Sequence, residues 1–301
     1  MVHRVFRAIA MPKLEILVRT PARPRPDSPR LLLVHGICVG AWVWEEHFMP
    51  YLADAGFEVH ALSLRGHGAS EGRERLDDWR LADYTDDLRR TAAALSDRPL
   101  VVIGHSLGGA VLQDWLRTGG NKAGNNGGHA GKIAGAALLA SVPPWGLAYS
   151  AWQMMLSSPD LFHQLLRLGG SNAASLDPAV MRRNLFSDDL PDDTYARFIR
   201  RVHGESRHVG VELQGWRPFA PAPWQAPPMF VLGGRADRFI GVNAVQGTAA
   251  YYGVLPVLVP RLAHALMLEP RWEDAAQPLC AWLERLDQRP HQRPDPQRTA
   301  R

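Results

Sequence analysis

Short apolar runs alternate with longer stretches of helical spacing along most of this chain. Runs without a polar side chain are typical of strands whose two faces are both buried, as in a parallel sheet. Helical spacing is clearest at residues 45–55 and 81–95. Strands that alternate with helices predict an α/β fold with a mostly parallel, doubly wound sheet. The expected strands lie at residues 13–20, 31–34, 57–64, 100–103, 133–140, 228–233 and 254–259, and a closing helix lies at 269–286.

This alternation stops between residues 145 and 225, where helical fragments follow one another. They are expected at residues 149–156, 159–168, 178–185 and 192–202. An insertion of this kind has its natural place over the carboxyl ends of the strands, where ligand sites of open α/β sheets lie. The sequence therefore predicts a helical cap at 145–225, a core made of residues 1–144 and 226–286, and a disordered Pro- and Arg-rich tail at 287–301.

A serine stands in a tight turn between one predicted strand and one predicted helix. Residues 104–108 read Gly-His-Ser-Leu-Gly, after the apolar run 100–103 and before a helix that is expected to start at 109–112. A G-x-S-x-G in this setting is a nucleophile elbow, which holds the serine hydroxyl clear of the sheet. We therefore expect Ser106 to be a nucleophile and the Leu107 amide to be an oxyanion donor. The alternative is a glycine-rich turn that happens to carry a serine.

A second glycine turn follows the strand at 31–34. Here His35, Gly36 and Ile37 stand where serine hydrolases with this elbow build the other half of the oxyanion hole. The Ile37 amide is the expected second donor, and His35 is a candidate residue of the substrate pocket. The alternative is an ordinary glycine turn with a histidine in the core.

Two residues with complementary chemistry also follow predicted strands. Asp237 comes after residues 228–233, and His264 comes after residues 254–259. The carboxyl ends of parallel strands meet at one edge of a sheet, so both can converge on Ser106. Neutral imidazole can take the proton of a serine hydroxyl near pH 7, and an aspartate fixes the imidazole tautomer. The sequence therefore predicts a catalytic triad.

Together these segments resemble the α/β-hydrolase superfamily, whose triad residues follow in the order Ser, Asp, His. The resemblance extends from about Leu31 to Leu283 and is weakest in the cap. It implies an α/β-hydrolase fold with the helical cap over the carboxyl ends of the strands. The segments that carry it are His35-Gly36, Arg65-Gly66-His67-Gly68, Gly104 to Gly108, Gly233 to Asp237, and Ala263-His264 through Glu269.

Residues 35–42, which read His-Gly-Ile-Cys-Val-Gly-Ala-Trp, are locally similar to the plant methylesterase and hydroxynitrile lyase group. In that group the lyases carry a lysine directly after the catalytic histidine, where it helps to bind cyanide. This chain has Ala265 at that position, which argues against lyase activity. It also departs from the group at Val39, where a histidine is common.

Four other polar residues are candidates for catalysis or zinc binding by residue type, but we do not expect them in the site. Arg65 and His67 follow the strand at 57–64, in a turn of a kind that is more often structural. His203 and His208 lack the H-E-x-x-H spacing of a zinc site. No metal and no cofactor is expected.

Substrate choice is expected to depend on the cap. The triad and the two amides touch only the carbonyl that every ester shares, so other surfaces must recognise the acyl and alcohol groups. Aromatic and Met residues of the cap are individually more often packing than pocket, but some must face the substrate. The candidates are Trp145, Trp152, Met154 and Met155.

Composition and charge exclude several classes of protein. The formal charge of +4 comes from dispersed arginines without a basic block, so nucleic-acid binding is not expected. Two cysteines, Cys38 and Cys280, make neither a disulfide framework nor a metal cluster, and we expect reduced thiols in the core. No signal peptide is expected at residues 1–18, and no apolar run approaches the ~20 residues that span a bilayer. We therefore expect no membrane association and a cytoplasmic location. The oligomeric state is left open.

These patterns predict a serine esterase that acts on a small or medium carboxylic ester through an acyl-Ser106 intermediate. A second hypothesis keeps the triad and changes the reaction to C–C bond hydrolysis, thioester hydrolysis, perhydrolysis or a lyase reaction. A third is a non-catalytic binding protein with the same fold, because fold alone does not determine function. The intact triad argues against the third hypothesis, and the first of the two catalytic hypotheses is preferred.

Overall fold

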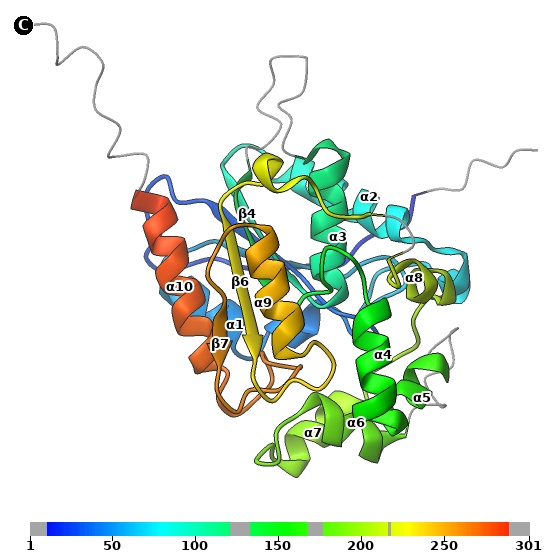
Figure 1. Ribbon diagram of the computed structural model, residues 1–301. Helices are drawn as coiled ribbons and strands as arrows, with labels where there is room; N and C mark the ends of the chain where they lie inside the picture. Colours follow the sequence, from blue (N-terminus) through cyan, green and yellow to red (C-terminus); the bar gives the residue numbers. More distant parts are fainter. Residues whose placement is uncertain (1–10, 121–132, 168–176, 216–217, 289–301) are drawn as a thin grey trace, which may run out of the picture.

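Seven strands form one sheet in the order β1-β3-β2-β4-β5-β6-β7 (Figure 1). The computed structural model describes residues 11–120, 133–167, 177–215 and 218–288 of the 301-residue chain. β1 pairs antiparallel with β3 at one edge, and the other pairs are parallel, which confirms the mostly parallel sheet. The carboxyl ends of β2 to β7 therefore lie along the same end of the sheet. The strands span Ile16–Arg19 (β1), Arg30–Val34 (β2), Val59–Leu62 (β3), Leu100–His105 (β4), Ile133–Leu139 (β5), Met229–Gly234 (β6) and Val257–Val259 (β7).

Helices cover both faces of this sheet (Figure 1). α1 and α10 pack on one face, and α2, α3 and α9 pack on the other, so the buried side chains form two cores with the sheet between them. The strand β2 shows why its sequence is continuously apolar: Leu31 and Leu33 belong to one core and Leu32 to the other, and all are fully buried. The helices span Phe48–Asp54 (α1), Leu81–Ala94 (α2), Leu107–Trp115 (α3), Val242–Tyr251 (α9) and Glu273–Gln288 (α10).

Five further helices come between β5 and β6 in the sequence. Of these, α4 to α7 gather near the end of the sheet to which β6 points, and α8 lies beside the start of α2 (Figure 1). Asp177 caps the amino end of α6 by accepting a hydrogen bond from the Ala179 amide, and Pro178 occupies the first turn of that helix. The helices span Ala148–Ser157 (α4), Pro159–Arg167 (α5), Pro178–Leu185 (α6), Asp192–Ile199 (α7) and Arg207–Glu212 (α8).

Some elements differ from the sequence prediction. The elbow helix α3 begins at Leu107 and not at residue 109, directly after Ser106. α8 and α9 were not expected, because α8 has only six residues and α9 carries small residues instead of a clear apolar stripe. In α9, Gly247 lets the ring of Trp145 approach, since a Cβ there would lie 2.6 Å from that ring. The tail expected at 287–301 falls outside the described residues from residue 289 on, and α10 extends to Gln288.

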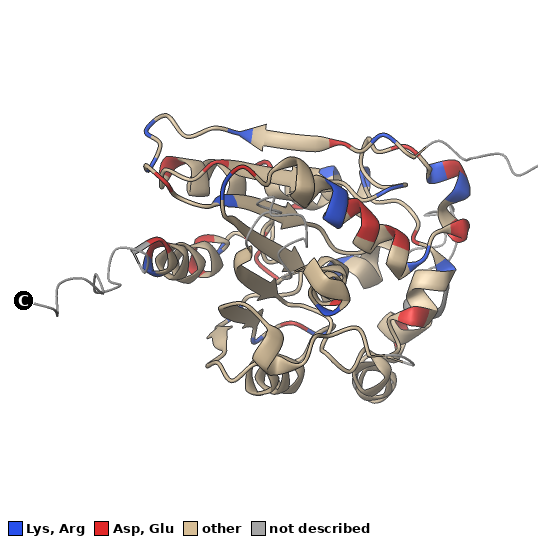
Figure 2. Ribbon diagram, turned by 90° about the horizontal axis from the view of Figure 1, so that it is seen from above, with Lys and Arg blue, Asp and Glu red and all other residues tan. Residues whose placement is uncertain are grey.

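Positions of acidic and of basic residues are interspersed along the ribbon (Figure 2). Arg30, for example, lies between Glu58 and Asp97, and Arg207 pairs with Asp77. Cys38 and Cys280 are buried free thiols. In the part of the chain that the structure describes, the helices are too short or too polar to cross a membrane.

Candidate active site

Ser106 lies between the last residue of β4 and the first residue of α3, in a strained backbone conformation. Its φ is 52° and its ψ is −116°. A Cβ at Gly104 would lie 2.5 Å from the carbonyl oxygen of Gly108, and a Cβ at Gly108 would lie 2.4 Å from that of Val34. Both positions must therefore be glycine for the strand and the helix to pass this closely, and this close approach maintains the turn that carries Ser106.

A chain of hydrogen bonds runs from Ser106 to a buried carboxylate. Nε2 of His264 is 3.1 Å from the Ser106 hydroxyl oxygen, and Nδ1 is 2.8 Å from Oδ2 of Asp237. An ionised carboxylate only accepts hydrogen bonds, so Nδ1 carries the imidazole proton and Nε2 is free to accept the serine proton. The structure thus brings together the three residues expected to form a triad, each just beyond the carboxyl end of a parallel strand.

Further contacts hold Asp237 and His264 in place. Oδ1 of Asp237 accepts hydrogen bonds from the amides of Phe239 (2.7 Å) and Ile240 (2.8 Å). The Phe239 ring packs on His264 with 4.8 Å between ring centroids. His105 donates from Nε2 to the backbone carbonyl of His264 at 2.9 Å. Burial, followed by the nearby His264, lowers the pKa of His105 well below its usual value, so His105 supports the site as a neutral ring. The position of His105 directly before Ser106 in the elbow is the sequence signal that could have indicated this role.

The two expected oxyanion donors lie beside the serine. Leu107 is the first residue of α3, where an amide has no partner within its own helix. Ile37 lines the same cavity as Ser106. Gly36 brings this loop close to the elbow, since a Cβ there would lie 3.1 Å from the Cβ of Ser106. Both residues therefore lie close to Ser106, and the role of their amides as donors remains a prediction.

An apolar cavity of about 620 Å³, including its open mouth, lies over Ser106 and His264. The described residues that line it include no Asp, Glu, Lys or Arg. Ala265 lies in the wall next to the histidine. The cap contributes Leu161, Met181, Leu185, Phe198 and Val202 from α5, α6, α7 and the turn after α7.

The pocket residues expected from sequence lie elsewhere. Trp152, Met154 and Met155 of α4 line a separate groove on the outer side of the cap, and Phe239 lies in the wall between this groove and the cavity. Trp145 is 42% exposed and packs on α9. His35 is fully buried and does not line the cavity: it donates from Nδ1 to the Gly36 carbonyl and accepts at Nε2 from the Leu64 amide. None of these five residues therefore lines the cavity over Ser106.

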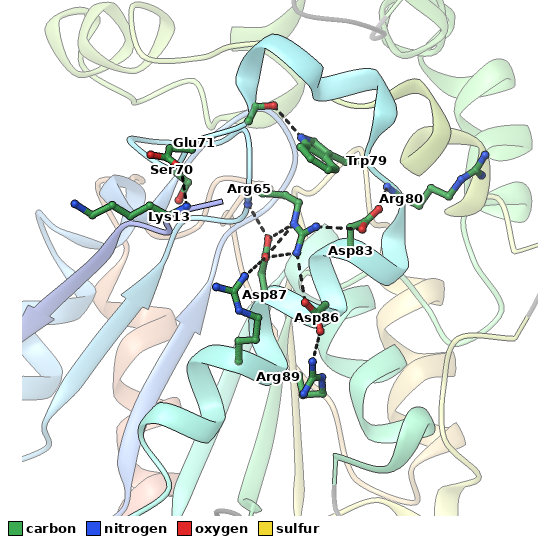
Figure 3. A network of polar contacts seen from close by, with 12 residues as sticks. Lys13, Arg65, Ser70, Glu71, Trp79, Arg80, Asp83, Asp86, Asp87 and Arg89 are labelled. Carbon is green, nitrogen blue, oxygen red and sulfur yellow. Dashed lines mark hydrogen bonds and ion pairs between the residues drawn. The ribbon is translucent and has the colours of Figure 1, made fainter. Parts of the chain in front are cut away.

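Arg65 belongs to a polar network of its own (Figure 3). Its guanidinium contacts Asp87 at 2.6 Å, Asp83 at 3.1 Å and Asp86 at 3.6 Å, all on α2. Burial raises the pKa of Asp87, although the hydrogen bonds and charge of Arg65 oppose this shift. The arrangement ties the turn after β3 to α2.

A buried glutamate between α7 and α8 was missed by sequence reasoning. Glu205 accepts hydrogen bonds from His67 Nε2 (3.0 Å), Tyr84 Oη (2.8 Å), the Ser206 amide (2.9 Å) and the Cys38 amide (3.3 Å). Burial alone would raise its pKa, but the charge and hydrogen bond of His67 and the further donors lower the pKa to about 2. Glu205 stands in the polar stretch His203-Gly204-Glu205-Ser206-Arg207, and nothing in that stretch indicates burial. The described residues form no cluster of three or more metal-ligating side chains.

Two curated relatives share part of the sequence. The AB hydrolase superfamily protein YfhM of Bacillus subtilis is 34% identical over 96 residues, or 32% of this chain and 33% of the relative. Polyneuridine aldehyde esterase of Rauvolfia serpentina is 39% identical over 88 residues, or 29% of this chain and 32% of the relative. The chain thus matches about a third of the length of each.

Fold and family agree over a larger part of the chain. A crystal structure of a Paleococcus ferrophilus monoacylglycerol lipase superposes with a TM-score of 0.64 and 20% identity, over 91% of this chain and 99% of that one. At this identity the likeness concerns the fold. The family model for the alpha/beta hydrolase family matches residues 31–277, most of the chain. The chain therefore belongs to the α/β hydrolase family.

Proposed function

We propose that this protein is a serine esterase that hydrolyses carboxylic esters with an apolar acyl group. The observation that carries the proposal is the continuous chain of hydrogen bonds from Ser106 through His264 to Asp237, with Ser106 and His264 in the wall of an apolar cavity. A hydroxyl that shares its proton with a neutral imidazole is the arrangement that acyl transfer to serine requires. The esterase among the relatives lends further support.

The reaction has two halves. In the first, Oγ of Ser106 attacks the ester carbonyl while Nε2 of His264 takes the hydroxyl proton, and the amides of Ile37 and Leu107 hold the oxyanion. The C–O bond to the alcohol then breaks, and the alcohol leaves with the proton from His264. In the second half, water gives a proton to His264 and attacks the acyl carbon, and Ser106 leaves with that proton. Asp237 stabilises the imidazolium in both halves.

The lining of the cavity suggests the substrate class. A charged group on the substrate would lose its water without meeting an opposite charge there, which typically costs several kcal/mol. Neutral, apolar acyl groups are therefore favoured over acyl groups that carry a carboxylate. The small side chain of Ala265 adds no cation beside His264, and this disfavours the lyase reaction.

A series of p-nitrophenyl esters with acyl chains of increasing length tests this function. We expect hydrolysis that depends on chain length, and a fall in kcat of about 10⁴-fold or more for Ser106→Ala, because the triad acts as a unit. A fluorophosphonate should label Ser106 in the wild-type protein, which mass spectrometry can locate. Ester hydrolysis by Ser106→Ala within about tenfold of wild type would exclude the proposal.

A further inference from the structure

The loop that carries the Ile37 amide is held by the cap at its next residue. Cys38 has a φ of 62°, a left-handed conformation that a side chain with a Cβ rarely adopts. Both backbone groups of Cys38 are bound: its amide donates to Oε2 of Glu205 at 3.3 Å, and its carbonyl accepts from the His203 amide at 3.0 Å. The segment 203–205 thus holds a strained residue directly after the expected oxyanion donor.

The carboxylate in this contact has a positively charged partner. Nδ1 of His67 is 3.0 Å from the carbonyl oxygen of Arg65, and Nε2 is 3.0 Å from Oε2 of Glu205. Both partners are acceptors, and a neutral imidazole has only one N–H, so making both bonds requires the imidazolium form. Burial opposes this charge, yet the adjacent Glu205 raises the pKa of His67 above its usual value. The pair is therefore a buried ion pair.

Other titratable groups around His67 leave this charge balance unchanged. His35 and His203 lie 5.1 Å and 4.8 Å away between ring centroids, and burial together with the His67 charge lowers their pKa values to about 3 and about 4. Burial raises the pKa of the Cys38 thiol and of Tyr84, which keeps both neutral. The remaining charged group that acts on His67 is Arg73, whose positive charge opposes the imidazolium.

We propose that Glu205, balanced in charge by His67, is a positioning residue for the oxyanion hole. It fixes Cys38 so that the preceding amide, that of Ile37, faces the carbonyl oxygen of the substrate. The inference rests on the proposed function, since it assigns a step of ester hydrolysis to this contact. The charge of His67 matters because an unbalanced carboxylate beside the loop would repel the oxyanion that forms there. Through this pair, the segment between α7 and α8 positions the oxyanion donor that acts beside Ser106.

Replacing Glu205 should affect the transition state more than substrate binding. For Glu205→Ala we expect kcat on a p-nitrophenyl ester to fall about 10²-fold, as when one oxyanion donor is lost, with KM changed by less than about threefold. Glu205→Gln keeps an oxygen that can accept from Cys38, and it should restore most of the lost kcat. Glu269→Gln is the matched control, because it neutralises another buried glutamate that binds a backbone amide, that of Ser187. Its kcat should stay within about threefold of wild type.

A measurement without substrate separates this inference from the proposed function. Hydrogen exchange of the peptide that contains residues 36–39 should be faster in Glu205→Ala than in wild type and unchanged in Glu269→Gln. If the wild-type protein hydrolyses no ester, the proposed function fails, and the exchange data still test the contact with Cys38. Three results for folded Glu205→Ala would each overturn the inference. They are a wild-type kcat, a rise in KM without a fall in kcat, and hydrogen exchange at residues 36–39 that equals the wild-type rate. If Glu205→Ala does not fold, the same criteria apply to Glu205→Leu, which keeps most of the side-chain volume but offers no oxygen to the Cys38 amide.

Discussion

At the scale of single residues, the nucleophile depends on positions where no side chain fits. The backbone strain at Ser106 costs about 1–3 kcal/mol and persists only because the surrounding contacts hold it. A Cβ at Gly108 would meet the carbonyl oxygens of Val34 and His35 at 2.4 and 2.6 Å. Backbone atoms inside the sheet cannot move aside as a flexible side chain can, so the elbow itself has to shift.

Gly108→Ala should therefore lower both stability and activity. We expect a loss of at least about 2 kcal/mol in the free energy of unfolding, because overpacking against backbone finds no relief. Gly210→Ala is the control, since a Cβ there has nothing within 4 Å and Gly210 lies in α8. It should be neutral or stabilising by up to about 1 kcal/mol. Urea unfolding of both variants, with ester hydrolysis alongside, checks the pair, and equal stability of the two variants would contradict the packing argument.

The tautomer of His264 gives a second prediction at this scale. In Asp237→Asn, the oxygen can stay with the amides of Phe239 and Ile240, which turns the new NH₂ group towards Nδ1 of His264. Nδ1 must then accept, the proton moves to Nε2, and Ser106 loses its base. We expect kcat to fall about 10⁴-fold with little change in stability, as the tautomer argument requires. A near wild-type rate in steady-state assays would mean that another residue is the acid of the triad.

At the scale of elements, the sequence predicted the strands and the triad but not the substrate cavity. A strand that is buried on both faces is apolar at every position, so β2 and β4 could be located without knowing their neighbours. The parallel arrangement then placed Ser106, Asp237 and His264 at one edge. Which side of a cap helix faces the cavity depends on how the cap packs, and sequence does not determine this. For that reason Trp152 and Met155 were expected in the cavity although they lie on its outer side.

The cap makes a prediction with two matched methionines. Met181 on α6 lines the cavity, whereas Met155 on α4 lines the outer groove and is 42% exposed. Met181→Ala should shift the ratio of kcat/KM towards longer acyl chains, because a pocket discriminates one methylene by about 1–3 kcal/mol. Met155→Ala should leave the ratio unchanged. Equal effects of the two variants on every ester would show that the acyl group binds elsewhere.

At the scale of the whole molecule, buried histidines make stability depend on pH. Burial, more than any nearby charge, lowers the pKa values of His35 to about 3 and of His203 to about 4, and that of His105 well below its usual value. The unfolded chain binds protons at these groups below pH 6.5, and the folded chain does not. Each of the three therefore reduces the free energy of unfolding by about 1.4 kcal/mol per pH unit as the pH falls from about 6.5 to the folded pKa of that histidine.

Two buried carboxyl groups partly offset this loss of stability at low pH. Burial raises the pKa values of Asp87 and Glu269, so the folded chain binds their protons at a higher pH than the unfolded chain does. As the pH falls, these two groups raise the free energy of unfolding. This gain offsets part of the loss that the three histidines cause. The larger number of histidines decides the sign, and stability should fall from pH 6.5 towards acid.

His67 acts in the opposite direction. Its folded pKa lies above the ordinary 6.5, so its contribution is complete below pH 6.5 and is lost as the pH rises through the folded value. The partner Glu205, with a pKa of about 2, contributes fully above 4.5 and loses its contribution only in strong acid. The free energy of unfolding should therefore have its maximum near pH 6.5. Urea unfolding at about pH 5, 6.5 and 8 measures this curve, and His67→Gln should remove the decline between about 6.5 and 8 while the acid decline remains. Stability that rises from about pH 6.5 to 8 in the wild-type protein, or a His67→Gln curve identical to it, would mean that His67 is not charged in the folded state.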